Sequence, residues 1–127
     1  MIPTRSPRPH FLNPMRIQMP VGALASIGHR LSGIVLAAGV PAGVYLLGLS
    51  LQDEQGFAQV SRLFTSLLFK GALVLVVWAL AHHVLAGVRH LLTDFNIGSP
   101  LAAGRRSAWL ANLGGVAVAL AAALVLL

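Results

Sequence analysis

The chain has 127 residues, of which 57% are hydrophobic and only 9% are charged. Soluble domains average roughly 25% charged residues, and so small a chain cannot enclose this much apolar surface in its own core. The composition therefore excludes an ordinary soluble domain and also a disordered segment, which needs high charge and low hydrophobicity. The formal net charge is +6, but the basic residues flank long apolar runs, which indicates membrane topology rather than nucleic-acid binding.

Three apolar segments are long enough to cross a bilayer, whose core needs about 20 helical residues. Residues 31–51 carry no charge, residues 63–88 are interrupted by one lysine and two histidines, and residues 107–127 are again uncharged. Pro20 suits the start of a helix that begins before the first apolar run. We predict an all-α, polytopic membrane subunit. Its single transmembrane domain spans residues 21–127, with three helices over about 21–51, 61–92 and 104–127.

The arginines predict the orientation of these helices. Residues 1–20 hold three arginines and five of the seven prolines, and no continuous apolar run, so we expect a cytoplasmic N-terminal segment there. Seven basic residues fall on the N-terminal side of the membrane: Arg5, Arg8, Arg16, Arg30, Arg89, Arg105 and Arg106. Only Arg62 and Lys70 fall on the other side. The positive-inside rule then predicts a cytoplasmic N-terminus and a periplasmic C-terminus in a bacterial inner membrane.

A histidine cluster stands at the cytoplasmic end of the second helix. His83, Gly87 and His90 follow an i, i+4, i+7 spacing and share one face, whereas His82 points about 100° away. A neutral imidazole is a good axial ligand for haem iron, and glycine leaves room for a flat macrocycle. Arg89 and His90, nearer the water, suit the haem propionates. The alternative is that these histidines are merely interfacial residues at a helix end.

A second cluster, SIGHRLSG at residues 26–33, stands at the start of the first helix. Ser26 and Arg30 lie one turn apart, where a hydroxyl and a guanidinium can donate to a carbonyl oxygen of a lipid-soluble quinone. The alternative is a serine at a helix start beside a positive-inside arginine. The chain has no cysteine and no protein-only catalytic set, so any chemistry needs a cofactor. One buried histidine supplies one of two axial ligands, and a partner must supply the other.

Together the two clusters resemble the cytochrome b membrane-anchor subunit of succinate dehydrogenase, the larger of the two anchors of complex II. The resemblance rests on Arg8-Pro9, on the Ser-x-x-His-Arg-x-Ser-Gly run at residues 26–33, and on the run HVLAGVRHLLTD at residues 83–94. The second run fits the family pattern His-x-x-x-Gly-x-Arg-His-x-x-x-Asp. The motifs stand in the expected order on the expected helices, so the resemblance covers nearly the whole chain.

The resemblance implies a role for each motif residue. His83 matches the axial ligand of haem b, and Ser26 and Arg30 match the contacts to ubiquinone. His29, Arg30 and His90 fall near the haem propionates, and Asp94 matches an acidic position that relays protons to the quinone. His82 departs from the family, where an aromatic residue is frequent.

The resemblance also implies a complex. Its other members are a second anchor subunit that shares the haem, an iron–sulfur subunit and a flavoprotein subunit. The complex transfers electrons from succinate to ubiquinone in the tricarboxylic acid cycle and respiratory chain, without catalysis by this chain alone. Two alternatives stay open: the anchor of a fumarate reductase that uses menaquinone, and a non-catalytic membrane scaffold or assembly protein.

Overall fold

In the computed structural model, which describes residues 19–127, the chain forms four helices. They are α1 (Val21–Ser50), α2 (Glu54–Leu63), α3 (Leu67–Asp94) and α4 (Leu101–Leu126). The all-α fold is confirmed, and α1, α3 and α4 are each long and apolar enough to cross a membrane. The expected cytoplasmic segment of residues 1–20 lies almost wholly outside the described residues, as does the Arg8-Pro9 pair.

The second expected helix, over about 61–92, differs from the structure, which divides this region between α2 and α3. The hydroxyl of Ser66 accepts a hydrogen bond from the Phe69 amide at 3.5 Å and caps a new helix start. Asp53 caps α2 in the same way, accepting from the Gly56 amide at 2.7 Å. The sequence between the first two apolar runs therefore holds a short polar helix instead of a simple loop.

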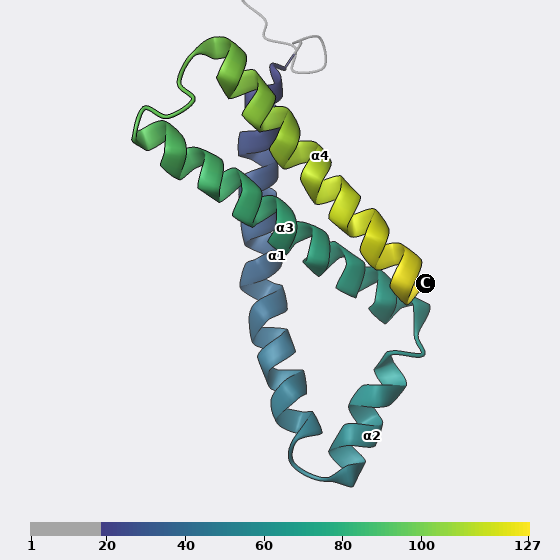
Figure 1. The fold of residues 1–127 in the computed structure, drawn as a ribbon. Coiled ribbons are helices and arrows are strands. Elements are labelled where there is room, and N and C mark those ends of the chain that lie inside the picture. The colour runs from purple at the N-terminus through teal and green to yellow at the C-terminus, as the bar shows by residue number, and fades with distance from the viewer. Residues whose placement is uncertain (1–18) are drawn as a thin grey trace, which may run out of the picture.

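The three long helices pack against one another, with α3 in contact with both α1 and α4. Figure 1 shows α3 and α4 running side by side in opposite directions while α1 crosses them, and α2 folds back from the far end of α1. A tight turn joins α3 to α4: Asn96 and Gly98 have φ angles of 59° and 75°, a left-handed conformation that favours Asn and Gly. The start of α1, the end of α3 and the start of α4 consequently lie at one end of the molecule.

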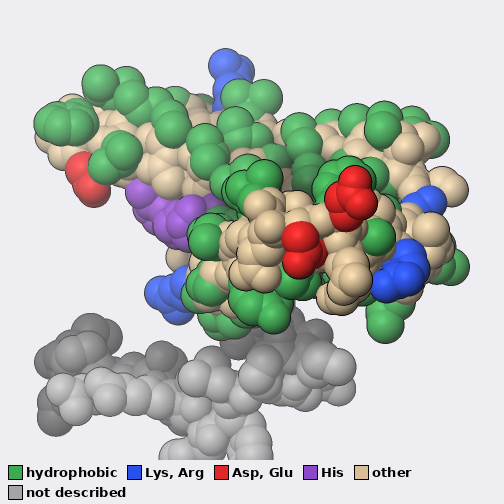
Figure 2. All heavy atoms as spheres, turned by 90° about the horizontal axis from the view of Figure 1, so that it is seen from below, with side chains coloured by type: hydrophobic (Ala, Val, Ile, Leu, Met, Phe, Trp, Pro, Cys, Tyr) green, Lys and Arg blue, Asp and Glu red, His purple; other side chains and the backbone are tan. Residues whose placement is uncertain are grey.

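The helices meet through small side chains. The buried residues of the long helices are alanine, glycine and serine with the exception of His82: Ala25, Ser32, Ala79, Ala86, Ala108, Ala111 and Gly115. Small residues let helix backbones approach closely, which is how helices associate where no water drives them together. Large apolar side chains face outward instead, and Figure 2 shows them covering much of one face. The apolar outer surface of the bundle is suited to contact with lipid and with partner helices.

Candidate functional site

The histidines of α1 and α3 meet where the two helices cross. The rings of His29 and His83 are stacked with their centroids 4.1 Å apart, and the rings of His29 and His90 are tilted at 5.2 Å. Figure 2 shows histidine side chains gathered in a single patch that reaches the surface. The structure thus brings together three residues that the sequence assigns to a haem neighbourhood.

The ring of His83 is held by two groups of α1. Its Nδ1 lies 3.1 Å from the Ser32 hydroxyl oxygen and 3.2 Å from the His29 carbonyl oxygen. A carbonyl can only accept, and the Ser32 hydroxyl itself donates to that same carbonyl at 2.9 Å. The proton of His83 therefore sits on Nδ1, which donates, and Nε2 keeps its lone pair.

This arrangement is the one that a metal-binding histidine needs. Ligand histidines commonly donate their second nitrogen to a carbonyl or another acceptor, which fixes the tautomer and orients the ring. Gly33 lets the ring approach α1 closely, since a Cβ there would come within 3.3 Å of His83 Cε1. The residues therefore fit an axial haem ligand at His83. The sequence did not predict Ser32 as the hydrogen-bond partner of His83, although Ser32 belongs to the motif at residues 26–33.

His82 lies on a different side of α3 from its neighbour His83. It is 3% exposed, and its Nε2 lies 3.0 Å from the amide oxygen of Asn112 on α4. Its ring is tilted against Trp78 at a centroid distance of 5.5 Å. With Nε2 occupied and the ring buried, His82 is enclosed by this chain, whereas His83 is half-buried at the histidine patch.

The positions of Gly87 and Arg89 differ from those that the sequence predicted. The space beside Gly87 is occupied by His29, whose Nε2 would lie 3.6 Å from an added Cβ, because α1 packs directly on this part of α3. Arg89 points away from the histidines toward α4, where its Nε donates to the Ser107 hydroxyl at 3.2 Å. Of the pair expected near haem propionates, only His90 lies in the histidine patch.

Ser26 and Arg30 flank His29 on α1, at the histidine crossing. Ser26 is half-buried and Arg30 is exposed, and neither side chain hydrogen-bonds to another residue within 19–127. Both stay within one turn of His29. Asp94 is the last residue of α3 and is exposed, one turn beyond His90. The residues assigned to quinone, propionates and proton relay thus share the same end of the molecule, around the α1–α3 crossing.

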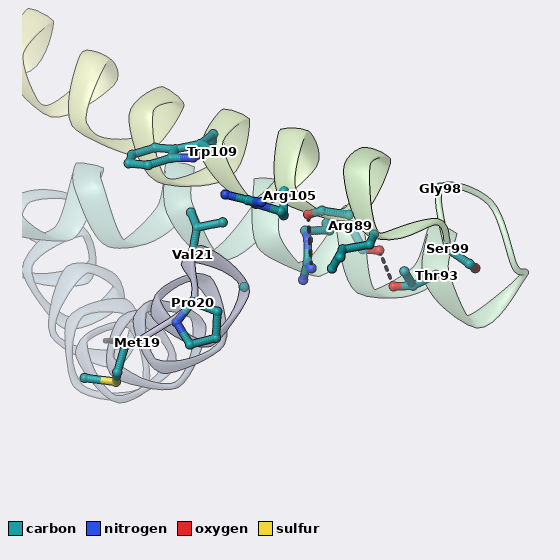
Figure 3. Close-up of a pocket in the computed structure, with 12 residues that line it drawn as sticks. Met19, Pro20, Val21, Arg89, Thr93, Gly98, Ser99, Arg105 and Trp109 are labelled. Atoms are coloured by element: carbon teal, nitrogen blue, oxygen red, sulfur yellow. Dashed lines mark hydrogen bonds between the residues drawn. The ribbon is translucent and has the colours of Figure 1, made fainter. Parts of the chain in front are cut away.

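A pocket of about 650 Å³ lies at this end but on the α4 side. Figure 3 shows Arg89, Arg105 and Trp109 lining it together with the start of α1. Apart from Arg89, which the sequence suggested for the haem propionates, none of the residues assigned to haem or quinone lines this pocket. The candidate site is therefore the histidine patch and the adjacent surface of α1 rather than this cavity.

Comparisons with known proteins agree with the family resemblance seen in the sequence. A model of the succinate dehydrogenase/fumarate reductase transmembrane subunit family matches residues 4–124. The succinate dehydrogenase cytochrome b556 subunit of Coxiella burnetii is 36% identical over 106 residues, which cover 80% of this chain and 82% of the relative. The subunit of the same name from Paracoccus denitrificans is 31% identical over 104 residues, covering 80% of this chain and 78% of the relative.

Proposed function

The chain belongs to the succinate dehydrogenase/fumarate reductase transmembrane subunit family, and we propose that it anchors a succinate:ubiquinone oxidoreductase and holds haem b together with a second anchor subunit. The name cytochrome b556, which both relatives carry, supports haem b as the cofactor. Both relatives are named for succinate dehydrogenase, which favours succinate oxidation over the fumarate reductase alternative.

The observation that carries the proposal is the tautomer of His83. Its Nδ1 proton is engaged by Ser32 and by the His29 carbonyl, which leaves Nε2 as a free lone-pair donor at the surface of α3. Haem b, when bound, supplies a site that accepts and releases one electron at a time.

The residues around His83 support propionate binding. His29 and His90 stand beside the ligand ring, and Arg30 follows His29 on α1 at the exposed surface. Imidazole N–H groups and a guanidinium donate to carboxylates, and a fixed positive charge strengthens such hydrogen bonds. We assign His29, Arg30 and His90 to the propionate end of the cofactor.

Ser26 and Arg30 carry the proposed ubiquinone contact. The Ser26 hydroxyl and the Arg30 guanidinium can each donate to a quinone carbonyl oxygen, and arginine does so without losing its charge. Fixed donors and a fixed charge stabilise the negative charge that develops on the oxygen during reduction. Asp94, exposed at the same end, is proposed to pass protons toward the reduced oxygen.

The topology supports a cytoplasmic location for this end. It contains Arg30, Arg89, Arg105 and Arg106 among the described residues, in agreement with the positive-inside rule. We therefore place the start of α1 on the cytoplasmic side of a bacterial inner membrane and the C-terminus on the periplasmic side. The iron–sulfur and flavoprotein subunits then dock at the end that holds the histidine patch and the quinone contact.

A single comparison tests this proposal. The complex is purified with wild-type chain and with His83→Ala, and reduced-minus-oxidised spectra are recorded at equal protein concentration. We expect a b-type spectrum in the wild type and its near-complete loss in His83→Ala, because one of two axial ligands is missing. A wild-type complex without haem, or a His83→Ala complex with an unchanged low-spin spectrum, would contradict the proposal and favour the scaffold alternative.

A further inference from the structure

His82 is the only large side chain buried in the described part of the chain. The other buried residues in 19–127 are alanine, glycine or serine, while His82 is 3% exposed. A histidine among such small neighbours is costly to bury unless its polar atoms are used. The side chain therefore needs an explanation beyond helix packing.

The ring of His82 fits a notch that two glycines form on the facing helices. A Cβ added to Gly28 of α1 would come within 2.6 Å of His82 Cε1, and one added to Gly115 of α4 would come within 3.0 Å of His82 Cβ. Real Cβ atoms essentially never come as close as 2.6 Å to another heavy atom, and a separation of 3.0 Å is already unusually tight. His82 is thus the point at which α1, α3 and α4 interlock.

A polar contact holds the ring in this notch. The amide oxygen of Asn112 lies 3.0 Å from His82 Nε2, so the ring donates its one proton across the α3–α4 interface. Nδ1 is left buried, and it has no hydrogen-bond partner among the described residues. With Nδ1 unpaired, the hydrogen bond to Asn112 is the only one among the described residues that offsets the cost of burying the ring.

His82, at which the three helices interlock, directly precedes the proposed haem ligand His83 in the sequence. Because α3 with its side chains is about 10–12 Å across, a rotation of about 10° displaces a side-chain tip by roughly 1 Å. The distances from His83 Nδ1 to Ser32 and to the His29 carbonyl are 3.1 Å and 3.2 Å. A shift of that size breaks both hydrogen bonds.

We propose that His82 and Asn112 form a positioning pair, which fixes the rotation of α3 about its axis and thereby aims the ring of His83. The inference rests on the proposed ligation by His83. Asn112 contacts neither the ligand ring nor its α1 partners, and acts on them through the notch alone.

The test uses the whole purified complex with Asn112→Leu, which keeps the volume of the side chain and removes the acceptor. Two quantities are measured: the g values of the low-spin haem in electron paramagnetic resonance, and the rate of haem transfer to excess apomyoglobin. A buried donor without an acceptor is costly, so His82 leaves the notch. We expect shifted g values and about tenfold faster haem loss, the loss typical of one unpaired buried group.

Two further variants separate positioning from general packing. In the double variant His82→Phe with Asn112→Leu, an apolar ring fills the notch and no buried polar group is left unpaired. We expect g values and haem loss close to wild type. Ser107→Ala removes another α3–α4 hydrogen bond, that of Arg89, and we expect wild-type g values.

Unchanged g values and an unchanged rate of haem loss in Asn112→Leu would contradict the positioning role of His82 and Asn112. An equal shift of the g values in Ser107→Ala would also contradict it. If Asn112→Leu does not assemble, the double variant decides: wild-type g values support the pair and shifted ones overturn it. Failure of the proposed function is recognised separately, because His83→Ala would then retain its haem.

Discussion

The Nδ1 atom of His83 on α3 and the hydroxyl of Ser32 on α1 lie 3.1 Å apart, across the crossing of the two helices. Ser32 is fully buried, so this hydrogen bond is shielded from competing water. The hydroxyl also donates to the His29 carbonyl at 2.9 Å. Ser32 therefore helps to orient the proposed haem ligand, whose tautomer is set by the His29 carbonyl.

Ser32→Ala should weaken haem binding without abolishing it. The His29 carbonyl still accepts from Nδ1 in this variant, but the ring loses one of two partners, and such losses typically lower metal affinity about 10- to 100-fold. Haem retention during dilution of the purified complex measures the effect. Ser50→Ala, at the far end of α1 where the hydroxyl only meets a carbonyl of its own helix, is the control. Equal retention in Ser32→Ala and wild type would remove Ser32 from the ligand set.

Ser26→Ala and Arg30→Leu should each lower succinate-driven quinone reduction. Loss of a hydrogen bond that involves a charged group costs ~1.5–3 kcal/mol, or roughly 10- to 100-fold in rate. For the neutral hydroxyl of Ser26 we expect a loss of rate at the lower end of this range. Reduction of an artificial dye at the soluble subunits should persist in both variants. Ser26→Ala should also keep its haem, whereas Arg30→Leu loses part of it through the propionates. Normal quinone kinetics in both variants would move the quinone site off α1.

The chain expressed without its partner subunits should not hold a bis-histidine haem. His83 has one nitrogen, Nε2, left for the iron, because its Nδ1 is engaged by Ser32 and the His29 carbonyl, and the other axial ligand is assigned to the second anchor. A low-spin spectrum from the isolated chain in detergent would show that both ligands are internal. Co-expression with the second anchor alone should restore the spectrum, since neither soluble subunit contributes a ligand.

Gly28→Ala should destabilise the helix bundle. The added Cβ would lie 2.6 Å from the enclosed ring of His82, and overpacking of this kind typically costs about 1–3 kcal/mol. Thermal unfolding of the complex in detergent measures the change. Gly48→Ala is the matched control in the same helix, since nothing lies within 4 Å of its added Cβ. There the higher helix propensity of alanine should leave stability equal or slightly raised. A Gly28→Ala complex as stable as the control would mean that His82 moves aside freely.

The all-α fold and the shared face of His83 and His90 could be predicted from the sequence for physical reasons that are local. Long uncharged runs leave a helix across the membrane as the only stable state, and the i, i+4, i+7 spacing places His83 and His90 on one face of α3. These inferences need only the geometry of a single helix. For the same reason Ser26 and Arg30 could be assigned to one turn of α1.

The role of His82 could not be read in the same way. Its environment comes from Gly28, Gly115 and Asn112, which stand on two other helices, and no periodicity links these positions. The direction of Arg89 is likewise decided by a hydrogen bond to Ser107 on α4. The separation of α2 from α3 is marked by the Ser66 cap at the start of α3, a signal that is weak beside the apolar run following it.

Because the interior of this bundle consists of small residues, its stability is sensitive mainly to substitutions that enlarge a buried side chain. Truncating an alanine or serine leaves almost no void, so the loss of stability is small. Enlarging one of them forces backbones apart, and two neighbouring helices must shift together. Inherited variation at these positions should therefore run among glycine, alanine and serine, while the outward-facing leucines and valines drift freely among apolar types. We expect side-chain size to be more tightly restricted at the helix crossings than on the outer surface.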